Sequence, residues 1–559
     1  MANSGALIGE EALSPAAQLF QSPSLNCYIV TMIGFKTKIN PNFVKAGLEQ
    51  TLLKHPLFSS KIVDGKEGRN MKWIPTTVKL ENHVFVPNLD PNIDHPDQFV
   101  EDYVSNLTKT PMDLSKPLWE IHLLNVKTSD AEAVGVFRIH HSIGDGASLT
   151  SLLIASTRKT SDPEALPTVP IKKRAGSTNS NTICWWILSI WCTIHLLNVK
   201  TSDAEAVGVF RIHHSIGDGA SLTSLLIAST RKTSDPEALP TVPIKKRAGS
   251  TNSNTICWWI LSIWFVLRLI WNTCVDFMLF LATFLFLKDT QSPIKGAPRC
   301  DLTTKRFAYR IVSLDDIKLV KNVMNMTIND VVLGATQAGL SRYLDRRYAE
   351  DKKDGDISNA NNLPESLRLR AIVFANIRAT AGIQDMAEMM TKGSKDKWGN
   401  EIGYVIFPLT IALHGDPLKH IGEVKAKMER KKLSLEAQCT LPFSCRVLKT
   451  FGVKAAAALT HTVFTNTTVA FSNVCGPLEE ISFFGHSIAF LAPSIYGFPH
   501  AITIHCQSYA DKMTIILAAD PNVVPDPHQL LDDLEESLQL IKDAALKKGS
   551  SKLLSEKED

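Results

Sequence analysis

Two adjacent histidines followed by an Asp-Gly pair are the residues of this chain best suited to chemistry. His140 and His141 precede Asp145 and Gly146 in the string HHSIGDG. Histidine, with a pKa of about 6.5 in water, is the usual side chain for accepting a proton at neutral pH. We expect Nε2 of His141 to deprotonate a bound alcohol as its oxygen attacks an acyl carbonyl. An acyl thioester suits this reaction, because its thiolate leaves readily.

The residues around the histidines are predicted to hold the loop in place. Asp145 can turn back to anchor it through a salt bridge or backbone N–H groups, and Gly144 and Gly146 permit a tight backbone. Adjacent histidines in a strand point to opposite faces and cannot bind one ion, so no metal site is predicted. The alternative, two ordinary strand-end histidines, does not explain the Asp-Gly at this spacing.

The string occurs twice, because residues 121–191 recur without a substitution as residues 194–264. The second copy offers His213, His214, Asp218 and Gly219 as candidate catalytic residues. Repeat architectures diverge and need three or more units, so we interpret the block as a recent tandem duplication or a mis-assembled gene sequence. Only the first copy follows Pro-Leu-Trp-Glu directly, and an insertion in the linker after it costs little closure entropy. We therefore expect the first copy to supply the catalytic residues, with the second copy as the alternative.

Local patterns predict the elements that position the motif. A β-rich stretch at 24–38 indicates a strand, and Asn40 with Pro41 indicates the start of a helix. Strands at 121–126 and 133–140 are expected to form a hairpin, which places His140 at a strand end. The C-terminal part is predicted to contain strands at 370–377, 401–413, 468–473, 488–492, 501–509 and 512–519, and helices at 327–347, 420–436 and 528–546.

Composition restricts the class of protein. The 559 residues are too many for one compact core and favour two domains, and 44% hydrophobic with 21% charged residues is ordinary for a folded chain. A net charge of +4 argues against a nucleic-acid partner. The ten cysteines form no CxxC pair, and the N-terminus lacks a signal-peptide pattern. We therefore expect reduced thiols and catalytic domains in the cytosol.

A long apolar tract at 256–287 follows a linker rich in Pro, Ser, Lys and Arg. It exceeds the roughly 20 residues that a membrane-spanning helix needs, whereas its shorter copy at 183–191 does not. Arg268, Asn272 and Asp276 lie four apart on one helix face. Crowded tryptophans favour membrane association, either spanning or lying in the interface. The alternative is a core helix whose polar stripe meets a partner.

Together with its flanks, the motif resembles a known family. HHSIGDG matches the HHxxxDG signature of the chloramphenicol-acetyltransferase-like superfamily. The flanks are similar to those of the plant wax ester synthase/diacylglycerol acyltransferase family, whereas the DFGWG string of the BAHD acyltransferases is absent. These flanks are Leu13-Ser14-Pro15, His55-Pro56, Pro117-Leu118-Trp119-Glu120, Asn329-Asp330 and Ser472-Asn473-Val474-Cys475-Gly476-Pro477, with Cys475 where proline often stands.

The resemblance implies an α/β fold of mixed sheets, with two domains (1–191 and 300–546) and an interdomain active-site tunnel. The duplicated segment 192–264, the apolar segment 256–287 and a disordered tail at 547–559 would be additions to it. The implied reaction joins a fatty acyl group from acyl-CoA, with no other cofactor, to a long-chain alcohol or to diacylglycerol. Acylation of a soluble alcohol, or a membrane-associated protein inactivated by the duplication, are the alternatives.

The resemblance also implies partners, a location and further site residues. Membrane lipids would be partners, and the endoplasmic reticulum membrane, or the plasma membrane, the location. The second motif histidine would be the base, and the Asn-Asp and Ser-Asn strings would lie where the two domains meet. Candidate substrate-binding residues are therefore Pro117, Leu118, Trp119, Asn329, Asp330, Ser472 and Asn473. Core packing, helix capping and a plain strand end are their respective structural alternatives.

Overall fold

The computed structural model describes residues 10–63, 71–90, 92–169, 192–197, 207–212, 254–297, 300–351, 361–378 and 398–558. For 192–197, 207–212, 254–260, 351, 441 and 551–558 it describes the backbone alone. The chain divides into two compact units, one made of Met1–Lys172 with Leu269–Asp559 and the other of Lys173–Arg268. The first unit contains the first copy of the motif and the whole C-terminal part.

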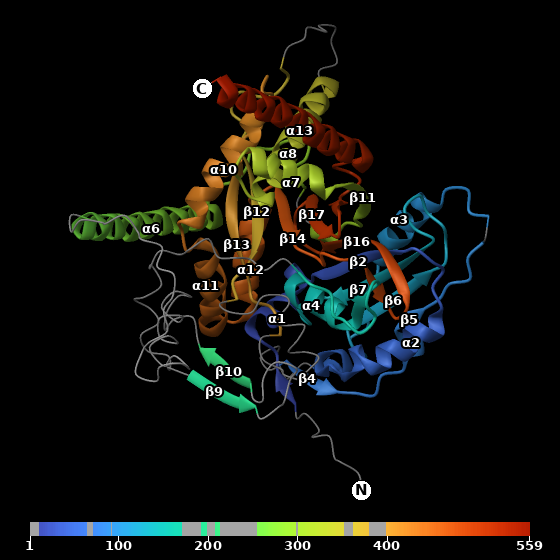
Figure 1. Cartoon of the computed structure of the whole chain (residues 1–559). Coiled ribbons are helices and arrows are strands. Elements are labelled where there is room, and N and C mark those ends of the chain that lie inside the picture. Colours follow the sequence, from blue (N-terminus) through green and yellow to red (C-terminus); the bar gives the residue numbers. More distant parts are fainter. Residues whose placement is uncertain are drawn as a thin grey trace, which may run out of the picture. The chain divides into compact units, whose positions relative to one another are not determined.

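A seven-stranded sheet carries the motif histidines (Figure 1). Its order is β5-β6-β7-β2-β16-β15-β8. The bounds are β2 Tyr28–Phe35, β5 Val84–Phe85, β6 Trp119–Leu124, β7 Ala133–His140, β8 Thr157–Lys159, β15 Ile481–Phe483 and β16 His486–Tyr496. The predicted hairpin is confirmed, since β6 pairs antiparallel with β7. The strand predicted at 24–38 is shorter, because residues 23–25 form a 3₁₀ turn before β2.

Two strands from the C-terminal part complete this sheet. β16 pairs antiparallel with β2 along its length, from Ile488 opposite Phe35 to Tyr496 opposite Tyr28. β15 pairs with β8, a strand in a stretch that the sequence predicted to be linker. That prediction is wrong at Arg158 and Lys159, where backbone pairing outweighs their polarity. The halves before and after the apolar tract therefore share one hydrogen-bonded sheet.

A second, six-stranded sheet belongs to the C-terminal half alone. Its order is β11-β18-β17-β14-β12-β13, with β14 parallel to both neighbours and the other pairs antiparallel. The bounds are β11 Arg306–Ser313, β12 Leu369–Asn376, β13 Ile402–Leu409, β14 Val469–Val474, β17 Ile502–Tyr509 and β18 Lys512–Ala519. Both sheets join helices in an α/β fold of mixed sheets, as predicted. A small three-stranded sheet consists of β1 Glu11–Ala12, β3 Ser60–Val63 and β4 Lys72–Pro75.

Helices cover these sheets, and their starts follow the predicted capping patterns. The side chain of Asn40 caps the helix that begins at Pro41. Thr327 and Asp330 form the predicted capping box, each accepting from the backbone N–H of the other. The α-helices are α1 Pro15–Phe20, α2 Pro41–Gln50, α3 Pro96–Leu107, α4 Gly146–Ser156, α6 Asn254–Leu285, α7 Leu314–Val323, α8 Ile328–Asp351, α10 Leu418–Lys432, α11 Glu436–Phe451, α12 Val453–Thr465 and α13 Pro527–Glu558. The 3₁₀ helices are η1 Pro23–Leu25, η2 Leu52–Lys54, η3 Pro56–Ser59, η5 Leu80–Asn82 and η6 Cys300–Leu302.

Two helical predictions need correction. The tail predicted to be disordered from 547 continues α13 as far as Glu558. The helix predicted at 420–436 ends at Lys432, and Glu436 opens α11 instead. Lys431 binds the buried Glu436 carboxylate at 2.5 Å, so the break between the helices is held by an ion pair.

The second copy of the repeat forms its own hairpin in the other unit. Strands β9 (Cys192–Leu197) and β10 (Val207–Ile212) pair with Ile194 opposite Phe210. This is the register of the first copy, where Ile121 lies opposite Phe137. Among the described strands, β9 and β10 pair only with each other. The same sequence thus forms the same local hairpin without joining the seven-stranded sheet.

Candidate active site

His141 follows the last residue of β7 and is buried. Its Nδ1 lies 3.0 Å from Oδ1 of Asn400, and Nδ2 of Asn400 donates to the His141 carbonyl at 2.9 Å. Because a carbonyl only accepts, the amide nitrogen of Asn400 must face it and Oδ1 must face the ring. Nδ1 of His141 therefore carries the proton. Its Nε2 has no hydrogen-bond partner among the described residues and presents a lone pair.

Burial sets the protonation state of this histidine. It lowers the pKa of His141, and the negative charge of Asp145 and the hydrogen bond to Asn400 oppose the shift only in part. The neighbouring His505 is also buried, which lowers its pKa to about 3 and leaves it uncharged. The imidazole of His141 is therefore neutral at physiological pH, which is the form that can accept a proton.

Asp145 anchors the motif loop as the sequence predicted. Its Oδ1 accepts from Ser148 N at 2.9 Å, which caps α4, and its Oδ2 receives Arg378 at 2.8 Å and the Glu401 N–H at 3.0 Å. The side chains of Asp145 and Arg378 are 2% and 1% exposed. Arg378 also donates to the Gly399 carbonyl at 2.7 Å. One buried ion pair therefore ties the motif loop to the segment that carries Asn400.

The glycines of the motif act differently from the prediction. Neither Gly144 nor Gly146 has a positive φ, so neither is required by backbone conformation. A Cβ on Gly144 would lie 3.3 Å from the ring of Trp398, whose indole N–H donates to the Ile143 carbonyl at 2.7 Å. Close packing against that ring and against the Ser148 Cβ, which would lie 3.1 Å away, explains this glycine. The glycine of the site that adopts a left-handed backbone conformation is Gly399, with φ +125°.

His140 points away from His141 and into the N-terminal half. Gln21 Nε2 donates to its Nδ1 at 3.0 Å, so its Nε2 carries the proton and donates to Asn26 Oδ1 at 2.9 Å. Burial lowers the pKa of His140 to about 3. Both ring nitrogens are thus committed to neighbouring side chains. The predicted opposite orientation of the two histidines is confirmed.

Phe20 and the apolar side chains beyond it cover one side of His141. The two ring centroids lie 4.2 Å apart. Phe20 and Leu149 pack against a hydrophobic cluster that includes Phe280 of α6, Tyr404 of β13 and Phe464 of α12. Apolar side chains therefore extend from the ring of His141 to the apolar helix.

The predicted substrate-binding residues outside the motif lie at two places near it. Asn473, next to Ser472 in β14, donates through Nδ2 to Oδ1 of Asn329, which precedes the capping residue Asp330. A Cβ on Gly146 would touch Val474 at 3.7 Å, so this corner adjoins the start of α4. Buried Pro117, Leu118 and Trp119 lead into β6, where the indole N–H of Trp119 donates to the Phe58 carbonyl at 2.9 Å. The Leu118 carbonyl accepts from the His140 N–H at 3.0 Å, so this string supports the motif strand by core packing.

Comparison with known proteins identifies the family. The wax ester synthase/diacylglycerol acyltransferase (WS/DGAT) catalytic-domain model matches residues 42–191, and the WS/DGAT C-terminal-domain model matches residues 398–542. The chain belongs to the wax ester synthase/diacylglycerol acyltransferase family. Relatives include wax ester synthase/diacylglycerol acyltransferase 11 of Arabidopsis thaliana, 43% identical over 97% of this chain and 96% of that protein. Wax ester synthase/diacylglycerol acyltransferase 5 of the same plant is 45% identical over 95% of this chain and 93% of that protein.

Solved structures support the same fold at low sequence identity. The wax ester synthase/diacylglycerol acyltransferase from Marinobacter aquaeolei VT8 matches with a TM-score of 0.52 and 16% identity, covering 96% of this chain and 99% of that one. The first condensation domain of the calcium-dependent antibiotic synthetase matches with a TM-score of 0.51 and 10% identity, covering 96% of this chain and 97% of that one. At these identities the likeness concerns the fold alone. The predicted chloramphenicol-acetyltransferase-like architecture is confirmed.

The WS/DGAT catalytic model distinguishes the two copies of the repeat. Its match ends at Trp191 and so contains His141 but not His214. Residues His213, His214, Asp218 and Gly219 lie outside the residues that the structure describes. The first copy is thus both within the family match and bound to Asn400.

Sequence reasoning missed several residues of this WS/DGAT site. Asn400, Arg378, Trp398 and Phe20 lie far from the motif in sequence, and no local pattern links them to it. The tunnel between the two domains stays a prediction. A cavity of about 370 Å³ lies elsewhere, between α3, β11 and α13, and none of the predicted site residues lines it.

Proposed function

We propose that this WS/DGAT family member transfers a fatty acyl group from acyl-CoA to a long-chain alcohol, giving a wax ester, or to diacylglycerol, giving triacylglycerol. The observation that carries the proposal is the reciprocal pair of hydrogen bonds between His141 and Asn400, which leaves a neutral Nε2 lone pair. The names of the relatives cover both products, which supports the two acceptors.

In the proposed reaction His141 acts as general base and then as general acid. The acceptor hydroxyl gives its proton to Nε2 while its oxygen forms a bond to the thioester carbonyl carbon. The tetrahedral intermediate collapses, the carbon–sulfur bond breaks, and the thiolate takes the proton back from Nε2. The products are the ester and CoA. Oδ1 of Asn400 stabilises the imidazolium between these steps, because it accepts from Nδ1.

Apolar surroundings favour a lipid acceptor over a soluble alcohol. The cluster beyond Phe20 contains aromatic and aliphatic side chains and reaches α6. Burial of an alkyl chain against such surfaces contributes about 0.8 kcal/mol per methylene group, which favours long chains. A short alcohol would gain little from them.

We propose supporting roles for most other predicted residues. His140 orients the strand end, Asp145 and Gly146 fix the loop and the start of α4, and Pro117, Leu118 and Trp119 hold β6. The pair Asn329–Asn473 braces the corner beside α4. Asp330 caps α8, and Ser472 belongs to the strand that carries Asn473. No metal or cofactor takes part in the proposed chemistry.

Membrane association is part of the proposal. Among the described residues, Leu261–Leu285 of α6 is the one stretch long and apolar enough to cross a membrane. Both acceptors dissolve in membranes, so we place the enzyme at the endoplasmic reticulum membrane, or at the plasma membrane, with its catalytic unit in the cytosol. Membrane lipids are then its partners.

The test compares three acceptors and two histidine variants that share the same local sequence. Membranes with the full-length chain receive labelled palmitoyl-CoA with hexadecanol, diacylglycerol or hexanol. We expect labelled wax ester or triacylglycerol, loss of at least about 10²-fold in His141→Ala, and near-normal activity in His214→Ala. Equal losses in both variants would contradict the assignment of His141. Product with hexanol alone would favour the soluble-alcohol alternative, and no product with any acceptor would favour an inactive protein.

A further inference from the structure

Helix α6 has two opposite faces, and one is docked on the C-terminal half. Of the predicted polar stripe, Asn272 and Asp276 are buried together with Phe280 and Thr283, whereas Arg268 is exposed and lies over the ring of Trp264. Asn272 Nδ2 donates to the Leu433 carbonyl at 3.1 Å. Asp276 Oδ1 accepts from Arg430 at 2.7 Å and from Lys431 at 3.1 Å. The polar stripe thus binds the end of α10.

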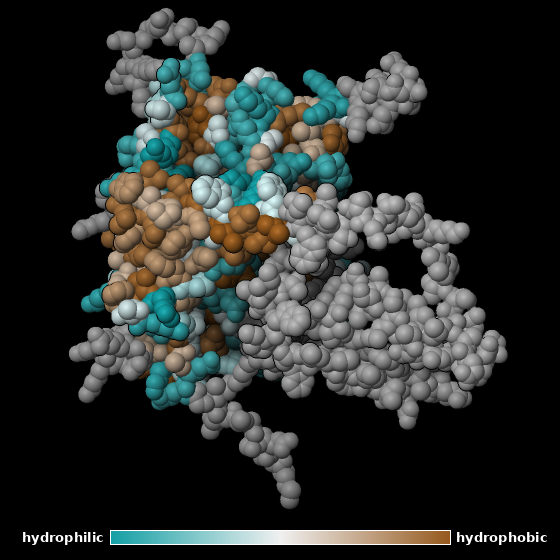
Figure 2. Space-filling view, turned by 90° about the vertical axis from the view of Figure 1, so that its left-hand side faces the viewer, coloured by the Kyte–Doolittle hydropathy of each residue, from teal (hydrophilic) through white to brown (hydrophobic). Residues whose placement is uncertain are grey.

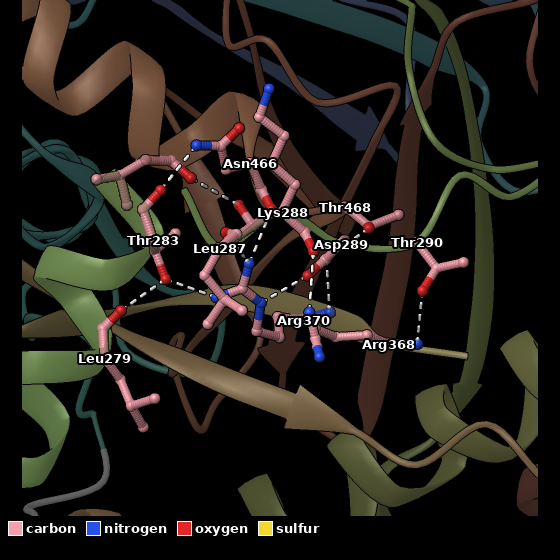
Figure 3. A network of polar contacts seen from close by, with 12 residues as sticks. Leu279, Thr283, Leu287, Lys288, Asp289, Thr290, Arg368, Arg370, Asn466 and Thr468 are labelled. Atoms are coloured by element: carbon pink, nitrogen blue, oxygen red, sulfur yellow. Dashed lines mark hydrogen bonds and ion pairs between the residues drawn. The ribbon is translucent and has the colours of Figure 1, made fainter. Parts of the chain in front are cut away.

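The C-terminal end of α6 is clamped by a second polar network (Figure 3). The guanidinium of Arg370 donates to Thr283 Oγ1 at 2.6 Å and to the Leu287 carbonyl at 2.8 Å, and it pairs with Asp289 at 2.5 Å. Asn466 Nδ2 donates to the Thr283 carbonyl at 2.7 Å. Arg370 lies in β12, so the helix end is fixed to a strand of the six-stranded sheet. These contacts set the rotation of α6 about its axis.

The opposite face of α6 is apolar and exposed. Leu267, Trp271, Met278 and Leu285 follow one another at spacings of four and seven and are 61%, 70%, 63% and 68% exposed. Figure 2 shows apolar side chains gathered on the described surface that faces the viewer. Exposed apolar area of this kind marks a site of protein or membrane interaction.

A single membrane crossing at α6 is incompatible with the shared sheet. β2 and β7 precede the helix and β16 follows it, yet these three strands are hydrogen-bonded neighbours. His141 likewise precedes α6 in the chain and Asn400 follows it, yet their side chains are hydrogen-bonded. One crossing would put the two halves on opposite sides of the membrane. Among the described residues no second helix is long and apolar enough to cross, and the apolar tract at 183–191 has only nine residues.

The face of α6 that packs on the C-terminal half gives a second argument against a membrane-spanning helix, independent of the shared sheet. Asn272 and Asp276 lie near the middle of the 25-residue stretch Leu261–Leu285. Arg430, which binds Asp276, would lie at the same depth, and its side chain is 37% exposed. Lys432, two residues further along α10, is 50% exposed. Exposed cations and irregular backbone are not stable in hydrocarbon.

We propose that α6 lies in the plane of the membrane surface, with its apolar face inserted at the boundary between headgroups and acyl chains. At 32 residues the helix is about 48 Å long, enough for a broad contact. The occupant of the face is a lipid surface, because Trp271 lies on it among long apolar side chains, and tryptophan is enriched at membrane interfaces. This deepens the proposed membrane association and does not depend on the reaction.

The first test measures on which side of a membrane the two ends of the full-length chain lie. Epitope tags at both termini are probed in sealed microsomes with external protease. An in-plane helix leaves both tags on the cytosolic side, so both are digested without detergent. One protected tag would show a single crossing and overturn the proposal.

The second test measures insertion of the exposed face. Full-length protein is floated with phosphatidylcholine vesicles in 0.5 M NaCl, with Trp271→Glu/Met278→Glu as the variant and Leu114→Glu as the control. Leu114 is 56% exposed and lies outside α6. We expect the double variant to bind at least about tenfold more weakly, which is about 1.4 kcal/mol, and the control to bind normally.

Other outcomes of the second test overturn the proposal. Unchanged binding of the double variant would show that the face does not contact lipid. A wild-type dimer in solution that the double variant disrupts, together with no vesicle binding, would assign the face to a second copy of the chain. Circular dichroism checks that the double variant is folded, and acyl transfer need not occur for the binding result to hold.

Discussion

Asn400 and His141 lie 259 positions apart and hold each other by two hydrogen bonds that run in opposite directions. The amide donates to the histidine carbonyl, and the histidine ring donates back to the amide oxygen. The direction of the first bond determines that of the second, so the pair fixes which ring nitrogen is protonated. The histidine comes from the N-terminal half and its orienting partner from the C-terminal half. The proton acceptor is therefore ready only when the two halves are assembled.

Replacing Asn400 by Asp should shift the pH profile of the enzyme. A carboxylate beside Nδ1 stabilises the imidazolium and therefore raises the pKa of His141. Because only neutral imidazole accepts a proton, the acid limb of kcat/KM should move to higher pH. Asn322→Asp, an exposed position on α7, adds the same charge away from the site and should leave the limb unchanged. An identical profile for Asn400→Asp and wild type would exclude Asn400 as the orienting group.

The wild-type pH profile tests the protonation state directly. Burial lowers the pKa of His141 below its usual 6.5. Neutral imidazole then persists as pH falls through 6.5, and activity should be lost only below that value. Initial rates from pH 4.5 to 8, with circular dichroism to verify folding, measure this limb. A limb centred above pH 6.5 would mean that another group governs proton transfer.

Local sequence patterns predicted the elements that carry the motif. The strand patterns at 121–126 and 133–140 identified a hairpin, and Asn40 with Pro41 identified a helix start. These features depend on residues within a few positions of one another. The capping box at Thr327 was predictable for the same reason.

The partners across the two halves could not be predicted from local patterns. Arg378 and Asn400 are single polar residues 233 and 259 positions beyond their partners, and nothing near them in sequence specifies the motif loop. The strand at 488–492 was predicted, but its place beside β2 was not. Strand propensity describes how a segment fits a sheet and leaves the neighbouring strand undetermined.

Substitutions of Asp145 and Arg378 should have non-additive effects on the free energy of unfolding, because the two side chains form a buried ion pair. Removing Arg378 leaves a buried carboxylate without its cation, which typically costs about 3–5 kcal/mol. Asp145→Asn keeps a good helix cap but removes the charge. The double variant Asp145→Asn/Arg378→Met should lose less than the sum of the single losses, by roughly 1–3 kcal/mol. Urea unfolding of the three variants measures this, and strictly additive losses would show that the pair does not interact.

Deleting residues 192–264 should leave the enzyme active and more soluble. Because 121–191 and 194–264 are identical, the product contains one uninterrupted copy whichever copy is considered removed. That copy keeps β6 joined to the Pro-Leu-Trp string and runs directly into α6. The two-stranded sheet β9–β10, whose edges are unpaired among the described strands, would be lost, and with it a site for aggregation.

Two measurements test this deletion. Specific activity with hexadecanol should equal or exceed that of the full chain, and the soluble fraction in detergent after expression should rise. His141→Ala in the shortened chain should abolish activity, since no second histidine motif remains to replace it. Residual turnover in that variant would show that the proton acceptor is a different group, and loss of activity in the unsubstituted deletion would show that the second copy contributes to the fold.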